Sequence, residues 1–492
     1  MYDVAVESAL DNAPGLTERT GNKVLLKRED EQPVYSFKVR GAYNRMAQLT
    51  DEEKARGVIT ASAGNHAQGV ANAAKYLGVK ATIVMPKTTP DVKVINVRRL
   101  GGKVILHGDA FDDARQHAAK LEEERGLTYI PPYDDPEVIA GQGTVAMEIL
   151  RQHTGPIDAI FIPVGGGGLI AGMAAYVKYL RPETKIIGVE FEESACLALA
   201  MKKGRRATLS QVGIFADGVA VAQIGKHTWE ICKDHVDEVI TVNVDQICAA
   251  VKDIFDDTRA ASEPAGALAV AGLKLYVERE QCQNKTLIAI NSGANVNFDR
   301  LRHIAERSEI GEKREMLIAA KIPERAGAFK QFCKTLGNRN ITEFNYRYSN
   351  PDDAIVFAGI QIRKNNDGRE ELLAELGNAL DEVTDLTDNE VAKMHIRHMV
   401  GGHKPDSCKE EALYRFEFPE RPGALMKFLN TLGGRWNISM FHYRNHGAAY
   451  GRVLVGMDVP RKERADIRKY FDELGYTWFD ETDNEAYRLF LG

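Results

Sequence analysis

Short apolar runs alternate with segments of helical periodicity over roughly the first 300 residues. The apolar runs predict buried strands at 80–86, 102–108, 159–164, 185–190 and 285–291. Helical spacing predicts helices near 90–100 and over 111–126. This alternation is typical of α/β proteins with parallel sheets. Glycine-rich or polar loops follow several strand ends, which is where open α/β sheets bind ligands.

The pattern changes after about residue 312, where an internal repeat begins. The stretch IPERAGAFKQFCKTLGNRNITEFNYR (322–347) returns as FPERPGALMKFLNTLGGRWNISMFHYR (418–444). Each copy continues with an alternating strand, at 354–362 or 451–459, and then a helix. A repeat of this kind indicates a duplicated module, and β-α-β-β-α-β is its simplest interpretation. The polar, glycine-bearing segment 397–411 is a candidate linker between the copies.

A chain of 492 residues is too long for one hydrophobic core. At ~150 residues per domain, about three units are expected. We therefore predict an α/β domain at 1–312 and two α+β modules at 316–390 and 411–485.

Composition narrows the class of protein. A hydrophobic fraction of 44% and a charged fraction of 27% are ordinary for a globular protein, and a net charge of −6 argues against nucleic-acid binding. The start, MYDVAVESAL, has no basic region, so we expect no signal peptide. The longest uncharged run, 159–177, is broken by Pro163 and four glycines, which favours a strand, a turn and a helix over a membrane span. Six cysteines without CxxC spacing predict a reduced, cytoplasmic protein.

Two glycine-bearing loops stand where a predicted strand gives way to a helix. In TASAGNHAQG (60–69) the helix start would present backbone N–H groups to an anion such as a carboxylate, although an ordinary cap by Ser62 or Asn65 is an alternative. In PVGGGGLIAG (163–172) the missing side chains would let the backbone approach a phosphate. This motif is neither GxGxxG nor a Walker loop. A tight turn is the alternative, but four glycines cost much chain entropy.

Lys38 and Ser292 complete a cofactor-type constellation. Lys38 lies in PVYSFKVRGA (33–42), and Ser292 lies in INSGAN (290–295) at the end of an apolar run. Alone, each is more simply explained as a surface lysine or a loop serine. Pyridoxal phosphate needs a lysine for a Schiff base, a phosphate loop, a polar partner for the ring nitrogen and a pocket for the amino acid's carboxylate. The four motifs together supply all of these.

The motifs SFKVRGA, SAGNHAQG, VGGGGL and SGAN, in this order and at these spacings, resemble those of fold-type-II pyridoxal-phosphate enzymes. The resemblance covers about residues 1–310 and implies a tryptophan-synthase-β-like catalytic domain of two α/β subdomains. The repeat resembles the paired ACT-like regulatory modules of biosynthetic threonine deaminases. Both halves together resemble that family over nearly the whole chain.

The resemblance implies a role for each motif residue. Lys38 would hold pyridoxal 5'-phosphate and serve as the base at Cα, and Phe37 would flank the cofactor ring. Asn65 would bond to the ring hydroxyl, and Ser292 would face the ring nitrogen. The remaining assignments are Ser62, Ala63 and Gly64 for the substrate carboxylate, and Val164, Gly165, Gly166, Gly167 and Gly168 for the phosphate cradle.

The implied activity is a lyase that converts L-threonine to 2-oxobutanoate and ammonia, the committed step of isoleucine biosynthesis. A neutral hydroxyl at Ser292 suits β-elimination better than transamination. The resemblance also implies a homotetramer, isoleucine as inhibitor and valine as counter-effector, with Tyr346 and Tyr443 as candidate effector residues. The alternatives are repeats that only assemble subunits, a serine dehydratase, racemase or cysteine synthase, and a non-catalytic amino-acid sensor.

Metal binding is not expected. Some relatives hold a cation with a pattern that starts at a glutamate after a strand, and Glu190 fits this start. Cys196, however, stands where the later carboxylate would be, and hard cations prefer oxygen ligands. His66 has no partners at zinc spacing, and Glu263 is a further residue that could face the cofactor cleft.

Overall fold

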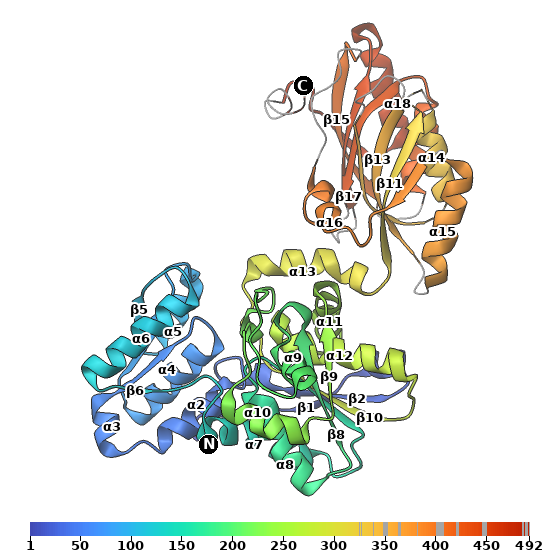
Figure 1. The fold of residues 1–492 in the computed structure, drawn as a ribbon. Coiled ribbons are helices and arrows are strands. Elements are labelled where there is room, and N and C mark those ends of the chain that lie inside the picture. Colours follow the sequence, from blue (N-terminus) through green and yellow to red (C-terminus); the bar gives the residue numbers. More distant parts are fainter. Residues whose placement is uncertain are drawn as a thin grey trace. The chain divides into compact units, whose positions relative to one another are not determined.

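The computed structural model describes residues 1–323, 325, 327–337, 339–347, 353–362, 366–380, 382–399, 408–419, 423–444, 450–484, 487 and 491. The chain forms two compact units, Met1–Ser308 and Glu309–Gly492. Figure 1 shows the fold of each unit. The predicted fold classes, α/β for the first unit and α+β for the repeat, are confirmed. The division of the repeat at 316–390 and 411–485 stays a prediction, and residues 400–407 of the predicted linker lie outside the described residues.

The larger sheet of the first unit has six strands in the order β1-β2-β10-β7-β8-β9. Their bounds are β1 Leu10–Asn12, β2 Lys23–Arg28, β7 Ala159–Pro163, β8 Lys185–Phe191, β9 Glu238–Val242 and β10 Thr286–Asn291. All neighbours pair in parallel except β1, which is antiparallel to β2. Both faces are covered by helices, as the continuous apolar runs of parallel strands require.

Alternate strand residues enter two separate cores on either side of this sheet. Phe161 packs with the helices of one face, and its neighbour Ile160 packs with those of the other. The first face carries α1 Pro14–Thr20, α11 Val244–Thr258 and α12 Pro264–Glu280. The second carries α7 Pro136–Gln152, α8 Gly168–Leu180, α9 Cys196–Lys203 and α10 Lys226–His235.

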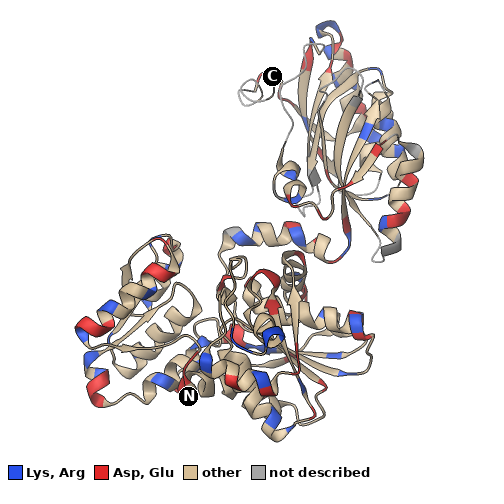
Figure 2. Ribbon diagram, viewed as in Figure 1, with Lys and Arg blue, Asp and Glu red and all other residues tan. Residues whose placement is uncertain are grey.

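A smaller, all-parallel sheet has the order β5-β4-β3-β6. Its strands are β3 Val58–Ala61, β4 Ala81–Met85, β5 Lys103–Leu106 and β6 Thr128–Tyr129. The surrounding helices are α2 Lys38–Ala47, α3 Asp51–Arg56, α4 Asn65–Leu77, α5 Asp91–Arg99 and α6 Phe111–Arg125. Figure 2 shows that charged residues gather on helices such as α3 and α6 while the inner strands are nearly free of them. The two sheets give the two predicted α/β subdomains.

The second unit is one antiparallel sheet of eight strands, in the order β14-β11-β13-β12-β16-β17-β15-β18. The first copy is β11 Glu315–Pro323, α14 Ala328–Leu336, β12 Ile341–Arg347, β13 Asp353–Gln361, α15 Asn366–Ala379 and β14 Glu382–Asp385, followed by the short helix α16 Glu390–Met394. The second is β15 Glu411–Pro419, α17 Ala424–Leu432, β16 Asn437–Arg444, β17 Tyr450–Asp458, α18 Arg464–Leu474 and β18 Thr477–Asp480. Each copy has the predicted β-α-β-β-α-β order, and β12 pairs with β16 to join the copies.

Two further features bear on the sequence predictions. The uncharged run at 159–177 forms strand β7, a glycine turn and most of helix α8. Within the described ranges, none of the helices combines the length and apolar character needed to cross a membrane. The first unit ends in α13 Phe298–Gly311, which continues past Ser308.

Candidate active site

Lys38 is the first residue of α2, and the chain around it contacts the predicted serine motif. The N–H of Phe37 donates to the carbonyl of Ser292 over 3.3 Å, and Ser36 forms an isolated bridge with Gly293. The Lys38 ammonium donates to the carbonyl of Pro132 over 3.0 Å and lies 5.2 Å from the centre of the Phe37 ring. The structure therefore brings 36–38 and 292–293 together, although they are far apart in sequence.

Desolvation lowers the pKa of Lys38 from 10.5 to about 8. The negative charge of Glu263 acts in the opposite direction and raises this pKa. A lysine must be neutral to attack an aldehyde or to remove a proton. Because the protein surroundings disfavour the charged form, more of the Lys38 amine is neutral near neutral pH than for a solvated lysine. Lys38 is thus chemically distinct from a surface lysine.

The loop at 62–65 leads from β3 into α4 without a side-chain cap. The N-cap residue is Gly64 and no side chain caps the helix, so the alternative of a cap by Ser62 or Asn65 is wrong. Ser62 Oγ instead accepts from the N–H of Gly64 over 3.3 Å. Because the first turn of a helix leaves its N–H groups without intrahelical partners, this start suits an anion.

Asn65 joins this loop to two other segments. Its Nδ2 donates to Glu263 Oε1 over 2.6 Å, and its Oδ1 accepts from Asn295 Nδ2 over 2.7 Å. Asn295 also donates to the carbonyl of Val34, close to Lys38 in the chain. Burial, with a smaller contribution from the charge of Asp217, raises the pKa of Glu263 to about 7. The sequence motifs at 33–42, 60–69 and 290–295 thus meet around one polar network.

The four glycines form the turn from β7 into α8, which begins at Gly168. Gly167 has a φ of 92°, a conformation that glycine adopts readily. A Cβ added to Gly166 would lie 2.3 Å from the Tyr133 ring, and one on Gly165 would lie 2.9 Å from the Cα of Val219. Close backbone approach therefore requires glycine at these positions. Val164, the residue before the turn, is buried and bonds to the carbonyl of Val189.

Pro132 and Tyr133 connect the lysine to the glycine turn, because Pro132 accepts from Lys38 while Tyr133 packs on Gly166. These two residues are site residues that the sequence motifs missed, whereas Asn295 lies in the motif at 290–295 but was given no role there. Two prolines and a tyrosine after a short strand give no recognisable sequence signal. Ser292 is buried, and within the described part of the chain its hydroxyl makes only a long contact of 3.5 Å with the carbonyl of Ala265, so it stays available to another partner.

Glu190 has a structural role, because its carboxylate is bound by backbone N–H groups. Its carboxylate accepts from the N–H groups of Leu197 and Ala198, each over 2.8 Å, and so holds the start of α9. Burial raises its pKa to about 7. Cys196 Sγ lies 3.3 Å from the carbonyl of Gly165. Across the described residues, no three His, Cys, Asp or Glu side chains gather in a way that would hold a metal ion, and the absence of a metal requirement stays a prediction.

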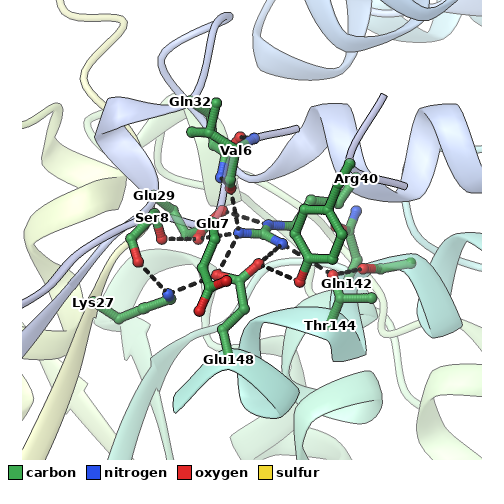
Figure 3. Close-up of polar contacts among 12 residues, drawn as sticks. Val6, Glu7, Ser8, Lys27, Glu29, Gln32, Arg40, Gln142, Thr144 and Glu148 are labelled. Carbon is green, nitrogen blue, oxygen red and sulfur yellow. Dashed lines mark hydrogen bonds and ion pairs between the residues drawn. The ribbon is translucent and has the colours of Figure 1, made fainter. Parts of the chain in front are cut away.

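A buried charge network, shown in Figure 3, lies behind the start of α2. Arg40, two residues after Lys38, binds Glu29 over 2.8 Å and Glu148 over 2.6 Å. Lys27 binds Glu148 over 2.6 Å. All four side chains are fully buried. Two cations balance two anions, so the network holds no net charge while it joins the N-terminal segment, β2, α2 and α7.

The residues present fit pyridoxal phosphate. A desolvated lysine, a cradle that a Cβ would fill and a hydroxyl with spare bonding capacity lie around one network. Comparison with known proteins agrees. A sequence profile described as "Pyridoxal-phosphate dependent enzyme" matches residues 6–293. One described as "C-terminal regulatory domain of Threonine dehydratase" matches residues 306–396 and 406–491.

Full-length relatives decide the family. The "L-threonine dehydratase biosynthetic IlvA" of Burkholderia multivorans is 56% identical over 494 residues, covering 100% of this chain and 97% of the relative. The chain belongs to the threonine dehydratase family. The Escherichia coli protein of the same name is 52% identical over 491 residues, covering 100% of this chain and 95% of the relative. As a member of this family the protein is a lyase that uses pyridoxal phosphate, which confirms the predicted family, enzyme class and cofactor.

Solved structures resemble about three-fifths of this chain. The processed form of tomato threonine deaminase isoform 2 has a TM-score of 0.62 and 52% identity, covering 62% of this chain and 89% of that one. Maize serine racemase has a TM-score of 0.59 and 34% identity, covering 61% of this chain and 92% of that one.

The two tyrosines predicted for effector binding lie on β12 and β16, the strands that join the repeats. Phe344 is opposite Tyr443, and Tyr346 is opposite Phe441. Tyr346 is buried and its ring lies 5.5 Å from that of Phe329. Tyr443 is partly buried against the same core. The structure thus places both at the junction of the two copies, and their role stays a prediction.

Proposed function

We propose that this chain deaminates L-threonine to 2-oxobutanoate and ammonia, the first committed reaction toward isoleucine. The observation that carries the proposal is the desolvated amine of Lys38, which donates to Pro132, the neighbour of the tyrosine that packs on the glycine cradle. Relatives named biosynthetic threonine dehydratases, which match along the full length of this chain, support threonine as the substrate. The predicted cytoplasmic location and homotetramer belong to the same proposal.

Each site residue then has a defined task. Lys38 binds the cofactor and, once displaced by substrate, its neutral amine removes the proton from Cα. When bound, pyridoxal phosphate would supply the electron sink that makes the Cα proton acidic enough to be removed. Gly165 to Gly168, with Val164 before them, hold the phosphate at the start of α8. Phe37 covers the ring.

The substrate and the ring polar groups use the other two loops. Ser62, Ala63 and Gly64 receive the substrate carboxylate at the start of α4. Asn65 faces the ring hydroxyl, held in place by Glu263 and Asn295. Ser292 faces the ring nitrogen with a neutral hydroxyl, which favours loss of the β-hydroxyl over transamination.

A depression between the two repeats is the proposed effector site, with isoleucine as inhibitor and valine as counter-effector. Its enclosed cavity volume is about 30 Å³, room for only a water or two, so the depression would have to widen to hold an amino acid. Apolar side chains from both copies line it, and Arg325 and the start of α14 give it positive character. Its apolar lining includes Ile322, Phe329, Tyr346, Leu429 and Trp436. Tyr443 does not line this depression, so its role would be indirect.

Two experiments test these proposals. Purified protein with pyridoxal phosphate should form 2-oxobutanoate from threonine, and Lys38→Ala should abolish this, while Lys120→Ala on exposed α6 should not. Turnover of serine but not threonine would contradict the substrate. A chain truncated after residue 310 should lose its response to isoleucine, and equal sensitivity without the repeats would overturn the effector proposal.

A further inference from the structure

The segment Phe215–Val219 forms a wall of the active site. A Cβ on Gly165, in the phosphate cradle, would lie 2.9 Å from the Cα of Val219. A Cβ on Gly218 would lie 3.5 Å from Glu263 Oε1 and 3.9 Å from Asn65 Nδ2. The backbone of this segment therefore packs against both the cradle and the polar network. A small displacement of the segment would therefore shift both the phosphate cradle and the Asn65–Glu263 pair.

Asp217 is the charged residue of this wall, and two cations from separate elements bind it. Lys93 on α5, in the smaller subdomain, lies 2.6 Å from Asp217 Oδ2. Arg300 on α13 lies 3.4 Å from Oδ1. The wall itself belongs to the larger subdomain, because Ala216 and Val219 are part of the core that contains α11 and α12. The Lys93–Asp217 pair thus joins the two subdomains across the wall.

Arg300 also fixes the other end of the wall. Its guanidinium donates to the carbonyl of Phe215 and lies 5.3 Å from the centre of the Phe215 ring. The His303 ring contacts the same phenylalanine, with centres 5.7 Å apart. The wall is otherwise a single turn of 3₁₀-helix, Asp217–Val219. Such a short turn has little rigidity of its own, so its place depends on these side-chain contacts.

We propose that Asp217 is a positioning residue for the reaction: through Lys93 and Arg300 it holds the Phe215–Val219 wall against the phosphate cradle and the Asn65–Glu263 pair. This inference rests on the proposed threonine deamination. The wall contacts residues that bind and contains no reacting atom, so we expect its displacement to weaken binding more than it slows the chemical step. Its loss therefore raises KM and leaves kcat nearly unchanged.

The test compares Lys93→Met with a matched pair elsewhere. The Lys93 and Asp217 side chains are 18% and 41% exposed. Lys178, near the end of α8, and Asp237, just before β9, form a pair of 2.8 Å with 15% and 38% exposure. Lys178→Met removes the same kind of interaction at the same exposure. It therefore controls for general effects of losing a half-exposed ion pair.

Threonine kinetics of the full-length holoenzyme give the readout. Lys93→Met should raise the threonine KM about two- to fivefold with kcat within about twofold, the range expected for one half-exposed pair. Lys93→Arg should restore KM, and Lys178→Met should leave it unchanged. Asp217→Lys should raise KM more, by about tenfold, because it faces two cations. If Asp217→Lys does not fold, the Lys93 variants carry the test.

A double-mutant cycle separates a specific pair from two independent effects. Lys93→Met combined with Asp217→Asn should raise KM less than the product of the single changes, because the pair can be lost only once. Multiplicative effects, or a KM for Lys93→Met equal to that of Lys178→Met, would overturn the proposal. Failure of the wild type to turn over threonine would instead refute the proposed function, so the two failures are distinguishable.

Discussion

The low pKa of Lys38 leads to a quantitative prediction for cofactor capture. With a pKa of about 8 instead of 10.5, the neutral amine fraction at pH 7 is about one in ten instead of about one in three thousand. The capture rate at that pH should therefore be about 300-fold faster than for a solvated lysine, other factors being equal. Desolvation is the main cause of the shift, and Glu263 opposes it.

The perturbation is Glu263→Gln in the full-length chain. Glu263 has a pKa of about 7, so it is largely ionised near pH 8, where Lys38 titrates. Removing its charge leaves the desolvation of Lys38 unopposed, so the pKa of Lys38 should fall further. Glu123→Gln, on the exposed face of α6, is the matched control and should leave that pKa unchanged.

The assay mixes cofactor-free protein with pyridoxal phosphate over a range of pH and follows the visible absorbance of the bound cofactor. The rate should rise with pH to a midpoint near 8 in the wild type and at lower pH in Glu263→Gln. A wild-type midpoint near 10.5 would refute the desolvation argument. A midpoint that moves upward in Glu263→Gln would refute the role of the carboxylate.

Three further predictions concern stability and the cradle. Arg40→Met leaves two buried glutamates without their main partner and should lower the free energy of unfolding in urea by about 3–5 kcal/mol. The control Lys120→Met removes an exposed pair and should lower it by less than about 1 kcal/mol. Equal losses in the two variants would contradict the stabilising role of the buried network. The pKa of Glu190 is about 7 in the folded protein against an ordinary 4.5, so the folded state binds more protons between these values and stability falls as pH rises through them. The stability of Glu190→Gln relative to wild type should therefore improve from pH 4.5 to pH 7, by up to about 3 kcal/mol, and a constant difference would contradict the shift. Gly166→Ala places a Cβ on the Tyr133 ring and should weaken cofactor affinity at least about tenfold by equilibrium titration; unchanged affinity would show that the cradle tolerates a side chain.

Periodicity predicted much of the fold from the sequence. The apolar run at 80–86 became β4, and the helical pattern at 111–126 became α6, within one residue at each end. Such segments carry their own signal, because burial of alternate faces imposes a period on the residues. The repeat likewise fixed the order of elements in each copy. The pairing of β12 with β16 carries no local signal, because either strand could have paired with another edge.

In the candidate site, too, some residues were predictable from the sequence and others were not. Motifs that need glycine or a strand-end hydroxyl were visible in the sequence, since few other residues fit those places. Pro132 and Tyr133 were missed, because their role depends on a packing partner far along the chain. Arg40 was visible only as part of a motif, and its burial between Glu29 and Glu148 depends on three separate segments. Long-range partners of this kind appear only in the folded structure.

The central claim is that the Lys38 amine holds the cofactor. Borohydride reduction of the protein loaded with pyridoxal phosphate, followed by peptide mapping, tests it most directly. In the wild type we predict one modified lysine, Lys38. In the Lys38→Ala variant we predict no stable modification at any position. A modified peptide that lacks Lys38, or a protein that traps no cofactor at all, would contradict the account.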